Sequence, residues 1–553
     1  MRALTFLYGG SLVSQAFEPV LNGISAFSLA LKQAAAFPGS EKTILLAGEG
    51  EVPELSASCM AEQQVSLIQR PAWTVSELLK TLSEESAGFD FAYYAWADSP
   101  FLDPVLAGKI AERHTRFASE YSYADGWPGG MAPELINSST AGILYKIAGE
   151  DGTGPVRRNS LFSVLQKDIN SFDIETEISA VDLRHHRLLF SADSKRKLLL
   201  LERFDRFFLP GETAGYAGNI AGVIADHPEY LRTLPAFFPI QVSGSCPQNS
   251  VGSCSLCPYP QFGAKGGSVY ERNDFLDLPD FIKLLDKIQQ FAGDGVIDLS
   301  LWGEFSLHPR REDFIQAVLD RPALSLLIET SGYGWTGLEI EKIAGQAAAA
   351  KPRFNGLPAV SWIVSLGPGD IPLGEPAGGP GHLQAVRETE AVSFVKKLVS
   401  VFPREAEKNS RVFVEAVRTA GAEDAIEKFY RAWKAAVFSA SGNGALDGIG
   451  PEVIIQKYDS FCGFLPQKQA VDLSPVERRP CWHLMRDFPV YIDGTVPLCR
   501  EDLSAECTIL GNAFHEDLET IWKQGEQSYL LHCRKEYAPG SCRICDEYYT
   551  FNF

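Results

Sequence analysis

Short apolar segments alternate along this chain with longer segments in which apolar residues recur every three or four positions. The short runs predict buried strands, and the longer period predicts helices with one buried face. In the first part of the chain the predicted strands are 4–8, 43–47 and 89–97, and the predicted helices are 23–36 and 103–118. Strands that alternate with helices predict a mostly parallel sheet covered on both faces.

A more regular series of the same kind begins at residue 240. The predicted strands are 240–242, 296–301, 324–329, 360–366 and 412–417, and the predicted helices are 278–291, 311–319, 338–350, 388–401 and 425–436. Polar residues or glycines follow each strand, which is typical of barrels whose site lies at the carboxyl ends of the strands. We therefore predict an α/β chain whose second part is a partial (β/α)6 barrel of the TIM type.

The chain has 553 residues, enough for several domains with packed cores. The patterning divides it into a first domain at 1–205, a connection at 206–238, a core at 239–450 and a small cysteine-rich domain at 451–553. These borders are predictions, because a sequence locates the ends of elements and domains less well than the elements themselves.

Charge and cysteine usage narrow the class of protein. Asp and Glu number 70 against 50 Lys and Arg, a net charge of −20, and nucleic-acid binding depends mainly on basic side chains, so we expect no nucleic-acid partner. We expect no membrane partner either, because no stretch approaches the ~20 apolar residues that span a bilayer. The 11 cysteines gather in two regions, which favours metal binding in a reducing compartment and thus a cytoplasmic protein.

The clustered cysteines form one group of three and one group of four. The first group, directly after the strand at 240–242, is Cys246, Cys254 and Cys257, and the second, in the last part of the chain, is Cys481, Cys499, Cys542 and Cys545. Four thiolates complete an iron–sulfur cluster, whereas three leave one iron free to bind another molecule. The arithmetic predicts an open, reactive cluster and a closed, auxiliary one.

The three-cysteine loop, followed by Gly303-Glu304 after the next strand, resembles the radical S-adenosylmethionine (radical SAM) superfamily. The resemblance implies a [4Fe-4S] cluster on Cys246, Cys254 and Cys257, and S-adenosylmethionine (SAM) on its open iron. The first cysteine gap is longer than the usual C-x3-C-x2-C, which only enlarges a loop, at a cost of under about 1 kcal/mol for a doubling of its length.

Further positions match the places where this superfamily contacts SAM. Gly303 and Glu304 match a Gly-Gly-Glu motif that receives the amino group of SAM, with Trp302 in place of the first glycine. Ser331, Ser365 and Arg418 follow or end successive strands, where the resemblance implies contacts to the ribose and carboxylate of SAM. For the two serines a turn-capping hydroxyl is an equal alternative. For His308, a packing or capping role is favoured over catalysis.

The cysteines of the last hundred residues resemble those of a SPASM domain, or of its shorter twitch relative. Cys481, the apolar segment 490–492, the turn Asp493-Gly494, Cys499 and the closing Cys542-x2-Cys545 follow in that family's order. An Asp-Gly turn makes a tight hairpin that can bring Cys499 near Cys481. The resemblance implies one auxiliary [4Fe-4S] cluster, and a structural zinc site is the alternative.

Four further cysteines are predicted to be ordinary thiols: Cys59, Cys462, Cys507 and Cys533. Cys462 is the first candidate for an exception among them.

The beginning of the chain resembles the nucleotidyltransferase fold, which is built on a Rossmann-type sheet. Gly9 and Gly10 match its glycine-rich loop, and Asp98 matches its magnesium-binding aspartate. The basic residue of that loop is missing, because no Lys or Arg lies between Gly10 and Lys32. A triphosphate without a cationic partner is poorly compensated. We therefore predict a degenerate domain, with a strand-end turn as the alternative role for Asp98.

Taken together, the layout resembles proteins of the spiro-SPASM type. The resemblance implies a radical SAM enzyme that abstracts hydrogen from a peptide, protein or small-molecule substrate and receives electrons from a reductant such as flavodoxin or ferredoxin. The first alternative is a nucleotidyltransferase fused to a redox or metal-binding module. The second is a cluster or zinc scaffold without turnover.

Overall fold

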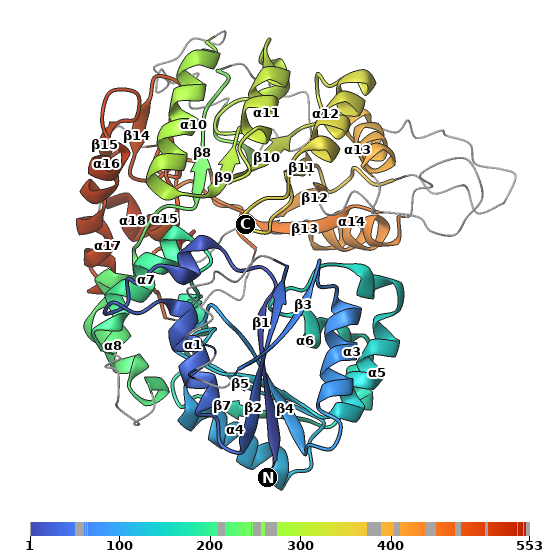
Figure 1. The fold of residues 1–553 in the computed structure, drawn as a ribbon. Helices are drawn as coiled ribbons and strands as arrows, with labels where there is room; N and C mark the ends of the chain where they lie inside the picture. The colour runs from blue at the N-terminus through green and yellow to red at the C-terminus, as the bar shows by residue number, and fades with distance from the viewer. Residues whose placement is uncertain are drawn as a thin grey trace, which may run out of the picture. The chain divides into compact units, whose positions relative to one another are not determined.

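The computed structural model describes residues 2–49, 60, 62, 65–207, 216–244, 246, 256–259, 274–372, 389–402, 410–436, 450–470, 477–503, 507–538, 540–545 and 547–548. The chain forms two compact units, Met1–Thr233 and Leu234–Phe553 (Figure 1). The border between them falls within the segment 206–238, which the sequence analysis treats as a connection.

The first unit is built on a sheet of seven strands. They are β1 (Ala3–Gly9), β2 (Ser40–Gly48), β3 (Ser66–Arg70), β4 (Phe91–Trp96), β5 (Tyr121–Asp125), β6 (Glu134–Ile136) and β7 (Ile174–Ile178), in the order β3-β2-β1-β4-β6-β5-β7. The pairs along the β3 to β4 half are parallel, whereas β6 runs antiparallel to both β4 and β5. The mostly parallel sheet predicted from the sequence is confirmed.

Helices cover both faces of this sheet. They are α1 (Ala26–Ala35), α3 (Val75–Glu85), α4 (Pro104–Arg116), α5 (Ser138–Ala148) and α6 (Ser160–Leu165), and α7 (Lys195–Asp205) and α8 (Ile220–Asp226) follow later in the chain. Successive strand side chains point to opposite faces. Phe6 accordingly lies in the core with α3, α5 and α6, and Leu7 lies in the core with α1 and α4.

The second unit contains a sheet of six parallel strands. They are β8 (Phe237–Pro239), β9 (Gly295–Asp298), β10 (Leu324–Thr330), β11 (Val360–Leu366), β12 (Ser410–Arg418) and β13 (Glu452–Lys457), and they follow one another across the sheet in chain order. The helices between them are α10 (Leu278–Ala292), α11 (Arg311–Leu319), α12 (Gly337–Ala349), α13 (Glu390–Val401) and α14 (Glu423–Ala435). Sequential order with parallel pairing is the topology of a barrel wall.

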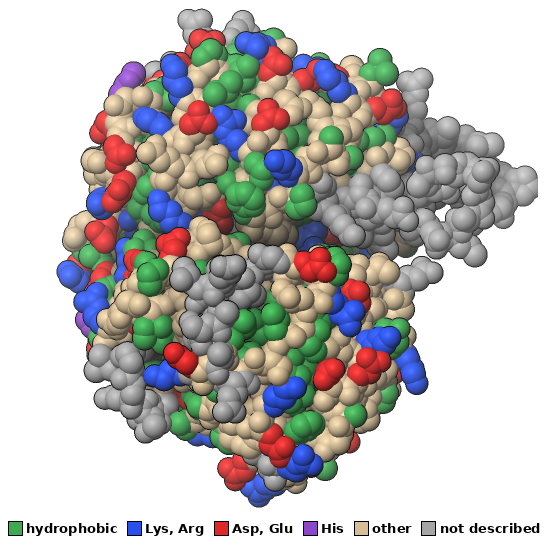
Figure 2. Space-filling view, viewed as in Figure 1, with side chains coloured by type: hydrophobic (Ala, Val, Ile, Leu, Met, Phe, Trp, Pro, Cys, Tyr) green, Lys and Arg blue, Asp and Glu red, His purple; other side chains and the backbone are tan. Residues whose placement is uncertain are grey.

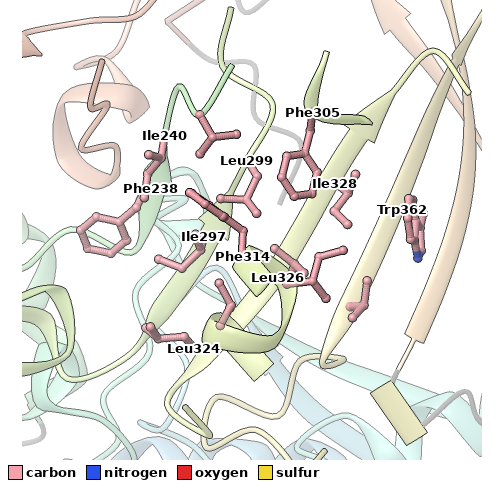
Figure 3. Close-up of a cluster of buried hydrophobic side chains, with 14 of the residues drawn as sticks. Phe238, Ile240, Ile297, Leu299, Phe305, Phe314, Leu324, Leu326, Ile328 and Trp362 are labelled. Atoms are coloured by element: carbon pink, nitrogen blue, oxygen red, sulfur yellow. The ribbon is translucent and has the colours of Figure 1, made fainter. Parts of the chain in front are cut away.

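The two faces of this sheet bury different residues. The helix-covered face carries the large core of the unit, in which Phe238, Ile297, Leu326 and Trp362 are buried (Figure 3). The opposite face carries a small apolar layer made by Phe237, Val296, Leu327, Ile363, Phe413 and Ile454. This layer closes the interior on one side of the strands.

Capping residues fix where the crossover helices begin. Thr336 accepts the Glu339 N–H, and the Glu339 carboxylate accepts the Thr336 N–H in return, so α12 begins in a capping box. At the start of α13, Thr389 Oγ1 accepts the Val392 N–H. Each cap satisfies helix N–H groups that otherwise have no partner.

The C-terminal part of the second unit is small and helical, with one hairpin. It contains α15 (Trp482–Arg486), β14 (Thr495–Pro497), β15 (Ile509–Asn512), α16 (Leu518–Gln524), α17 (Glu526–Cys533) and α18 (Gly540–Ile544), and β14 pairs antiparallel with β15. The predicted tight turn at Asp493-Gly494 is present, since Tyr491 N donates to the Thr495 carbonyl at 2.8 Å and Gly494 N donates to the Tyr491 carbonyl at 2.9 Å, but the segment 490–492 before it forms no separate strand. That segment instead follows β8, with bridges from Asp487 to Phe237 and from Val490 to Ile240, because its apolar side chains complete the main core.

Most predicted elements occur with small shifts in their ends. The strand at 360–366 and the helix at 311–319 have the predicted bounds. The predicted strand at 240–242 lies earlier, as β8, because Phe237 and Phe238 pair with β9. The sixth strand, β13, is absent from the predicted series, since it follows a long stretch without a clear pattern.

The surface of the molecule carries both signs of charge. Figure 2 shows Lys and Arg side chains interspersed with Asp and Glu over the face that it presents. Among the described residues, no helix combines the length and the apolarity that crossing a membrane requires.

A substitution at Gly494 tests how much the turn at Asp493-Gly494 contributes to the stability of the second unit. Gly494 has φ +85°, and a Cβ there would lie 2.6 Å from both Asn512 Oδ1 and Phe514 Cδ2. We expect Gly494→Ala to destabilise the second unit by about 2 kcal/mol through strain and crowding. Gly345→Ala is the matched control, because a Cβ within α12 meets nothing within 4 Å, and it should stabilise by up to about 1 kcal/mol. Thermal unfolding of both variants measures the difference, and equal shifts would contradict the account.

Candidate active site and metal centre

A cavity of about 310 Å³ lies at the carboxyl ends of the parallel strands of the second unit. Predicted site residues that line it are Cys246, Cys257, Gly303, Glu304, Ser331 and Ser365. They come from four different loops or strand ends, which the parallel topology brings to one edge of the sheet. Cys254, between the two lining cysteines in the sequence, lies outside the described residues.

Glu304 is fixed by the end of the neighbouring strand. Its Oε1 accepts a hydrogen bond from Thr330 Oγ1 at 2.6 Å, and its Oε2 accepts from Ser331 N at 3.0 Å and Ser331 Oγ at 2.6 Å. Burial raises the pKa of Glu304, and these hydroxyl donors oppose the rise. Ser331 therefore orients Glu304 in this structure, a contact that the sequence analysis did not foresee.

Trp302 occupies the position where the resembling motif has a glycine. Its φ is +48°, in the left-handed region that glycine enters without steric cost. The Trp302 carbonyl accepts from Gln241 Nε2 at 3.0 Å, and its ring packs on Phe461 with the centroids 5.7 Å apart. These contacts explain how a bulky residue is held in a strained conformation there.

Carboxyl groups form the floor of the cavity. Two residues beyond the small apolar layer on each strand, and therefore on the same face, come Asp298 in β9, Glu329 in β10, Ser365 in β11, Glu415 in β12 and Gln456 in β13, all of which line the cavity. An acidic residue within an otherwise apolar strand is the signal in the sequence for this layer. Of these five residues, only Ser365 was predicted from the sequence to belong to the site.

The carboxyls of this floor hold protons more tightly than exposed ones. Burial raises the pKa of Asp298 to about 7 and that of Glu415 to about 8, and in both cases the charge of Glu329 adds to the rise. The pKa of Glu329 is itself raised by burial, while Arg500 opposes the rise. Near neutral pH the floor is therefore partly protonated and can both donate and accept hydrogen bonds.

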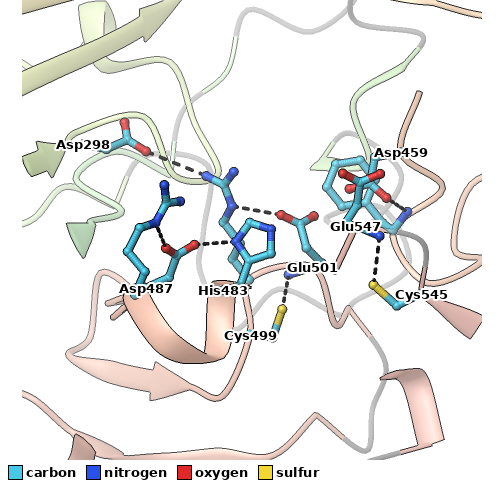
Figure 4. Close-up of polar contacts among 11 residues, drawn as sticks. Asp298, Asp459, His483, Asp487, Cys499, Glu501, Cys545 and Glu547 are labelled. Carbon is cyan, nitrogen blue, oxygen red and sulfur yellow. Dashed lines mark hydrogen bonds and ion pairs between the residues drawn. The ribbon is translucent and has the colours of Figure 1, made fainter. Parts of the chain in front are cut away.

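Ion pairs from the C-terminal part border the floor (Figure 4). Arg500 Nε lies 2.9 Å from Glu501 Oε1, and Arg500 Nη1 lies 4.0 Å from Asp298 Oδ2. Beside them, Asp487 lies 2.6 Å from both His483 Nδ1 and Arg486 Nε. Arg486 and His483 hold the pKa of Asp487 well below its usual range although burial opposes this. Charged side chains therefore line the cavity both from the strand ends and from the C-terminal part.

A second, small cavity holds cysteines of the C-terminal part. Its lining includes Cys462, Cys481, Cys499, Cys542 and Cys545. All four predicted auxiliary ligands therefore lie together. Cys462 lies with them, although it was predicted to be an ordinary thiol and named only as the first candidate for an exception. Cys507 and Cys533 are not among the described residues that line this cavity, and Cys59 lies outside the described residues.

Backbone amides point at three of these sulfurs. Glu501 N donates to Cys499 Sγ at 3.4 Å, Glu547 N donates to Cys545 Sγ at 3.3 Å, and amides of α15 donate to Cys481. Such N–H groups stabilise thiolate charge, the form that binds iron. Among the described residues, no three His, Cys, Asp or Glu side chains are arranged around a single metal-ion position. The residues fit an iron–sulfur cluster, which places each thiolate on a different iron.

Two predicted residues lie elsewhere. Arg418 ends β12 but is not among the described residues that line the large cavity. His308 is buried, with Nε2 3.1 Å from the Leu276 carbonyl and Nδ1 accepting from Arg310 N at 3.1 Å. Because backbone groups occupy both ring nitrogens, His308 has the packing and capping role that the sequence analysis favoured.

In the first unit, Asp98 faces an arginine. Arg158 Nη2 donates to Asp98 Oδ2, and the same atom lies 3.2 Å from Asp193 Oδ2. The Arg158 guanidinium also lies over the Trp96 ring, 4.4 Å from its centroid. A cation thus lies where the resemblance would place Mg²⁺, and sequence alone could not reveal a partner 60 residues away.

Comparison with known proteins identifies the last part of the chain and one relative. Residues 481–546 match the model of the SPASM family, an iron–sulfur cluster-binding domain. An uncharacterized protein of Treponema pallidum (strain Nichols) is 35% identical over 395 residues, which are 71% of this chain and 98% of that protein. The chain belongs to the same family as that protein. The C-terminal SPASM domain of this chain contains Cys481, Cys499, Cys542 and Cys545, and Cys462 lies before that domain.

Two solved structures are similar to different parts of this chain. A cytidylyltransferase from Leptospira borgpetersenii covers 42% of this chain and 97% of its own, with 12% identity and a TM-score of 0.35. BtrN in complex with AdoMet and 2-DOIA covers 57% and 92%, with 14% identity and a TM-score of 0.34.

The raised pKa of Glu415 predicts a pH-dependent difference in stability. The pKa of Glu415 rises from 4.5 in the unfolded chain to about 8 in the folded one. As the pH increases between these two pKa values, this carboxyl increasingly destabilises the folded state. We expect Glu415→Gln to unfold at a higher temperature than the wild type at pH 8, with a gap that narrows towards pH 5. Glu536→Gln, at an exposed position, is the control for loss of a charge. A gap that is constant with pH would contradict the assignment.

The contact between Asp98 and Arg158 predicts a stability coupling. Asp98→Ala leaves Arg158 without its main partner, and since Arg158 is partly exposed, we expect a loss of about 2 kcal/mol. The double variant Asp98→Ala/Arg158→Met should recover most of it. Hydrogen exchange at the amides of β4 measures the change locally, and additive losses in the double variant would refute the coupling.

Proposed function

We propose that this chain is a radical SAM enzyme with one auxiliary iron–sulfur cluster. The observation that carries the proposal is the common cavity of Cys246, Cys257, Gly303, Glu304 and Ser331 at the carboxyl ends of parallel strands. A family model independently assigns cluster binding to the SPASM domain. Thiolates beside an open cavity are what an incompletely ligated cluster requires.

In this proposal Cys246, Cys254 and Cys257 hold the first [4Fe-4S] cluster. When bound, that cluster and SAM would supply a 5′-deoxyadenosyl radical that abstracts hydrogen from the substrate. The chain's own part is to bind and to orient. Gly303 would present backbone groups to the amino group of SAM, and Glu304 would offer it the carboxyl oxygens that Ser331 orients. Ser365 and Arg418 remain proposed contacts to SAM.

The floor of the cavity suits a substrate with hydroxyl or amino groups. Asp298, Glu329 and Glu415 offer buried carboxyl oxygens. A substrate group that hydrogen-bonds to them is held firmly, whereas leaving a buried polar group without a hydrogen bond costs free energy. Arg500 supplies a counter-charge from the SPASM domain. A peptide, a protein side chain or a small polar molecule would each provide such groups.

Cys481, Cys499, Cys542 and Cys545 hold the auxiliary [4Fe-4S] cluster in this proposal. Glu501 and His483 line both cavities, so the two sites share a wall of charged side chains. That proximity suits electron transfer or ligation of the substrate by the second cluster. A flavodoxin or ferredoxin in a reducing cytoplasm would supply the electron.

The alternative function, nucleotidyl transfer by the first unit, has weaker support. Asp98 is occupied by Arg158, and a carboxylate already paired with a guanidinium is a poor ligand for Mg²⁺. The sequence between Gly10 and Lys32 also lacks the cation that a triphosphate needs. We infer a substrate-holding or structural role for the first unit.

Reductive cleavage of SAM tests the proposal. Protein reconstituted with iron and sulfide and reduced with dithionite should release 5′-deoxyadenosine, measured by liquid chromatography. Cys257→Ala should abolish the release, because it removes a ligand of the open cluster. Cys507→Ala, at a cysteine outside the described lining of both cavities, should retain it. Absence of release from a wild-type protein with full iron content would refute the function.

A further inference from the structure

Five thiols surround the small cavity, although a [4Fe-4S] cluster has only four irons to ligate. Cys481, Cys499, Cys542 and Cys545 belong to the matched SPASM segment, whereas Cys462 comes from the chain between β13 and α15. One thiolate per iron completes the cluster. The Cys462 sulfur therefore lies beside the four expected ligands although the cluster needs no fifth one.

Cys462 differs from Cys481, Cys499 and Cys545 in what its sulfur meets. Backbone N–H groups point at Cys481, Cys499 and Cys545, which prepares these three for negative charge. The side chain of Cys462 instead makes its hydrogen bond with the sulfur of Cys545. A sulfur that hydrogen-bonds to a ligand sulfur from a segment before the matched domain fits a reserve position better than a permanent one.

The backbone holds Cys462 in this place at a cost. Phe461, Cys462 and Gly463 have φ values of +50°, +53° and +81°, so two non-glycine residues in succession adopt the left-handed conformation. Each such residue costs roughly 1 kcal/mol or more. Phe461 N donates to Asp459 Oδ1 at 2.7 Å, and Gly463 N donates to Ser460 Oγ at 3.2 Å. These bonds fix the turn that presents Cys462 to Cys545.

The same turn borders the large cavity. Asp459 and Phe461 line that cavity, and the Phe461 ring packs on Trp302. Cys462, between Phe461 and Gly463, lines the small cavity instead. The fifth thiol is thus carried by the segment that separates the two sites.

We infer that Cys462 is an alternative ligand of the auxiliary cluster and can replace Cys545 on the same iron. In the exchange the Cys462 thiol gives up its proton as its sulfur–iron bond forms, and the Cys545 sulfur takes up a proton as its own bond to iron breaks. No electron moves, and the number of irons is unchanged. The inference rests on the auxiliary cluster of the proposed function and is independent of SAM cleavage.

The test uses the full chain with Cys246, Cys254 and Cys257 all changed to Ala, so that iron reports only the auxiliary cluster. Adding Cys545→Ala should leave iron and sulfide content close to this background after reconstitution, because Cys462 takes the vacant iron. Adding both Cys545→Ala and Cys462→Ala should remove most of the iron. Cys481→Ala should also remove it, since Cys462 lies against Cys545. Cys507→Ala is the control for loss of an unrelated thiol.

Electron paramagnetic resonance of the reduced protein adds a readout that iron content lacks. The Cys545→Ala spectrum should be that of a [4Fe-4S] cluster with g values shifted from the background, because a different thiolate binds one iron. The inference is overturned if Cys545→Ala loses as much iron as Cys481→Ala, or if the variant without both Cys462 and Cys545 keeps its cluster.

A metal-free measurement tests the contact even if a variant reconstitutes poorly. In the Cys542→Ala form of the same background, diamide should join Cys462 to Cys545. The two thiols lose two protons and two electrons to diamide, which becomes the hydrazine. Mass spectrometry of the digested protein should find the linked peptides. A disulfide from Cys545 to Cys481 or Cys499 instead would overturn the inference.

Discussion

The buried guanidinium of Arg500 joins the parallel sheet of the second unit to its SPASM domain. Arg500 follows Cys499 in the chain, yet it reaches Asp298 at the end of β9 as well as its neighbour Glu501. Burial works against its charge, and the surrounding carboxylates, Glu501 foremost, outweigh burial and raise the pKa of Arg500. An unpaired buried charge costs several kcal/mol, so the strand end and the domain must stay together. This constraint brings Cys499 and the cavity floor into one site.

Three successive residues, from Cys499 to Glu501, connect the two cavities. Cys499 faces the small cavity, Arg500 faces the large one, and Glu501 lines both. Adjacent residues therefore connect a proposed closed cluster with a proposed substrate floor. The six parallel strands supply the rest, because their carboxyl ends deliver acidic side chains above an apolar layer that seals the interior.

Local pattern and spacing were enough for much of this architecture. The bounds of β11 and α11, the common cavity of Glu304 with Cys246 and Cys257, and the gathering of Cys481 with Cys499 all agree with the sequence analysis. What it missed depends on distant partners. Arg158 on Asp98, Cys462 on Cys545, and the segment 487–490 beside β8 each join residues that no periodicity relates. The acidic floor was visible as single carboxyls within apolar strands, but only the register shows that they share a face.

The central claim is that the first cluster keeps an iron open for SAM. Electron–nuclear double resonance on the reduced, reconstituted Cys481→Ala/Cys499→Ala protein, which retains only that cluster, tests it with SAM carrying ¹⁵N in its amino group. The account predicts a new ¹⁵N hyperfine coupling when SAM is added and none when unlabelled SAM replaces it. A cluster spectrum that SAM leaves unchanged would contradict the account.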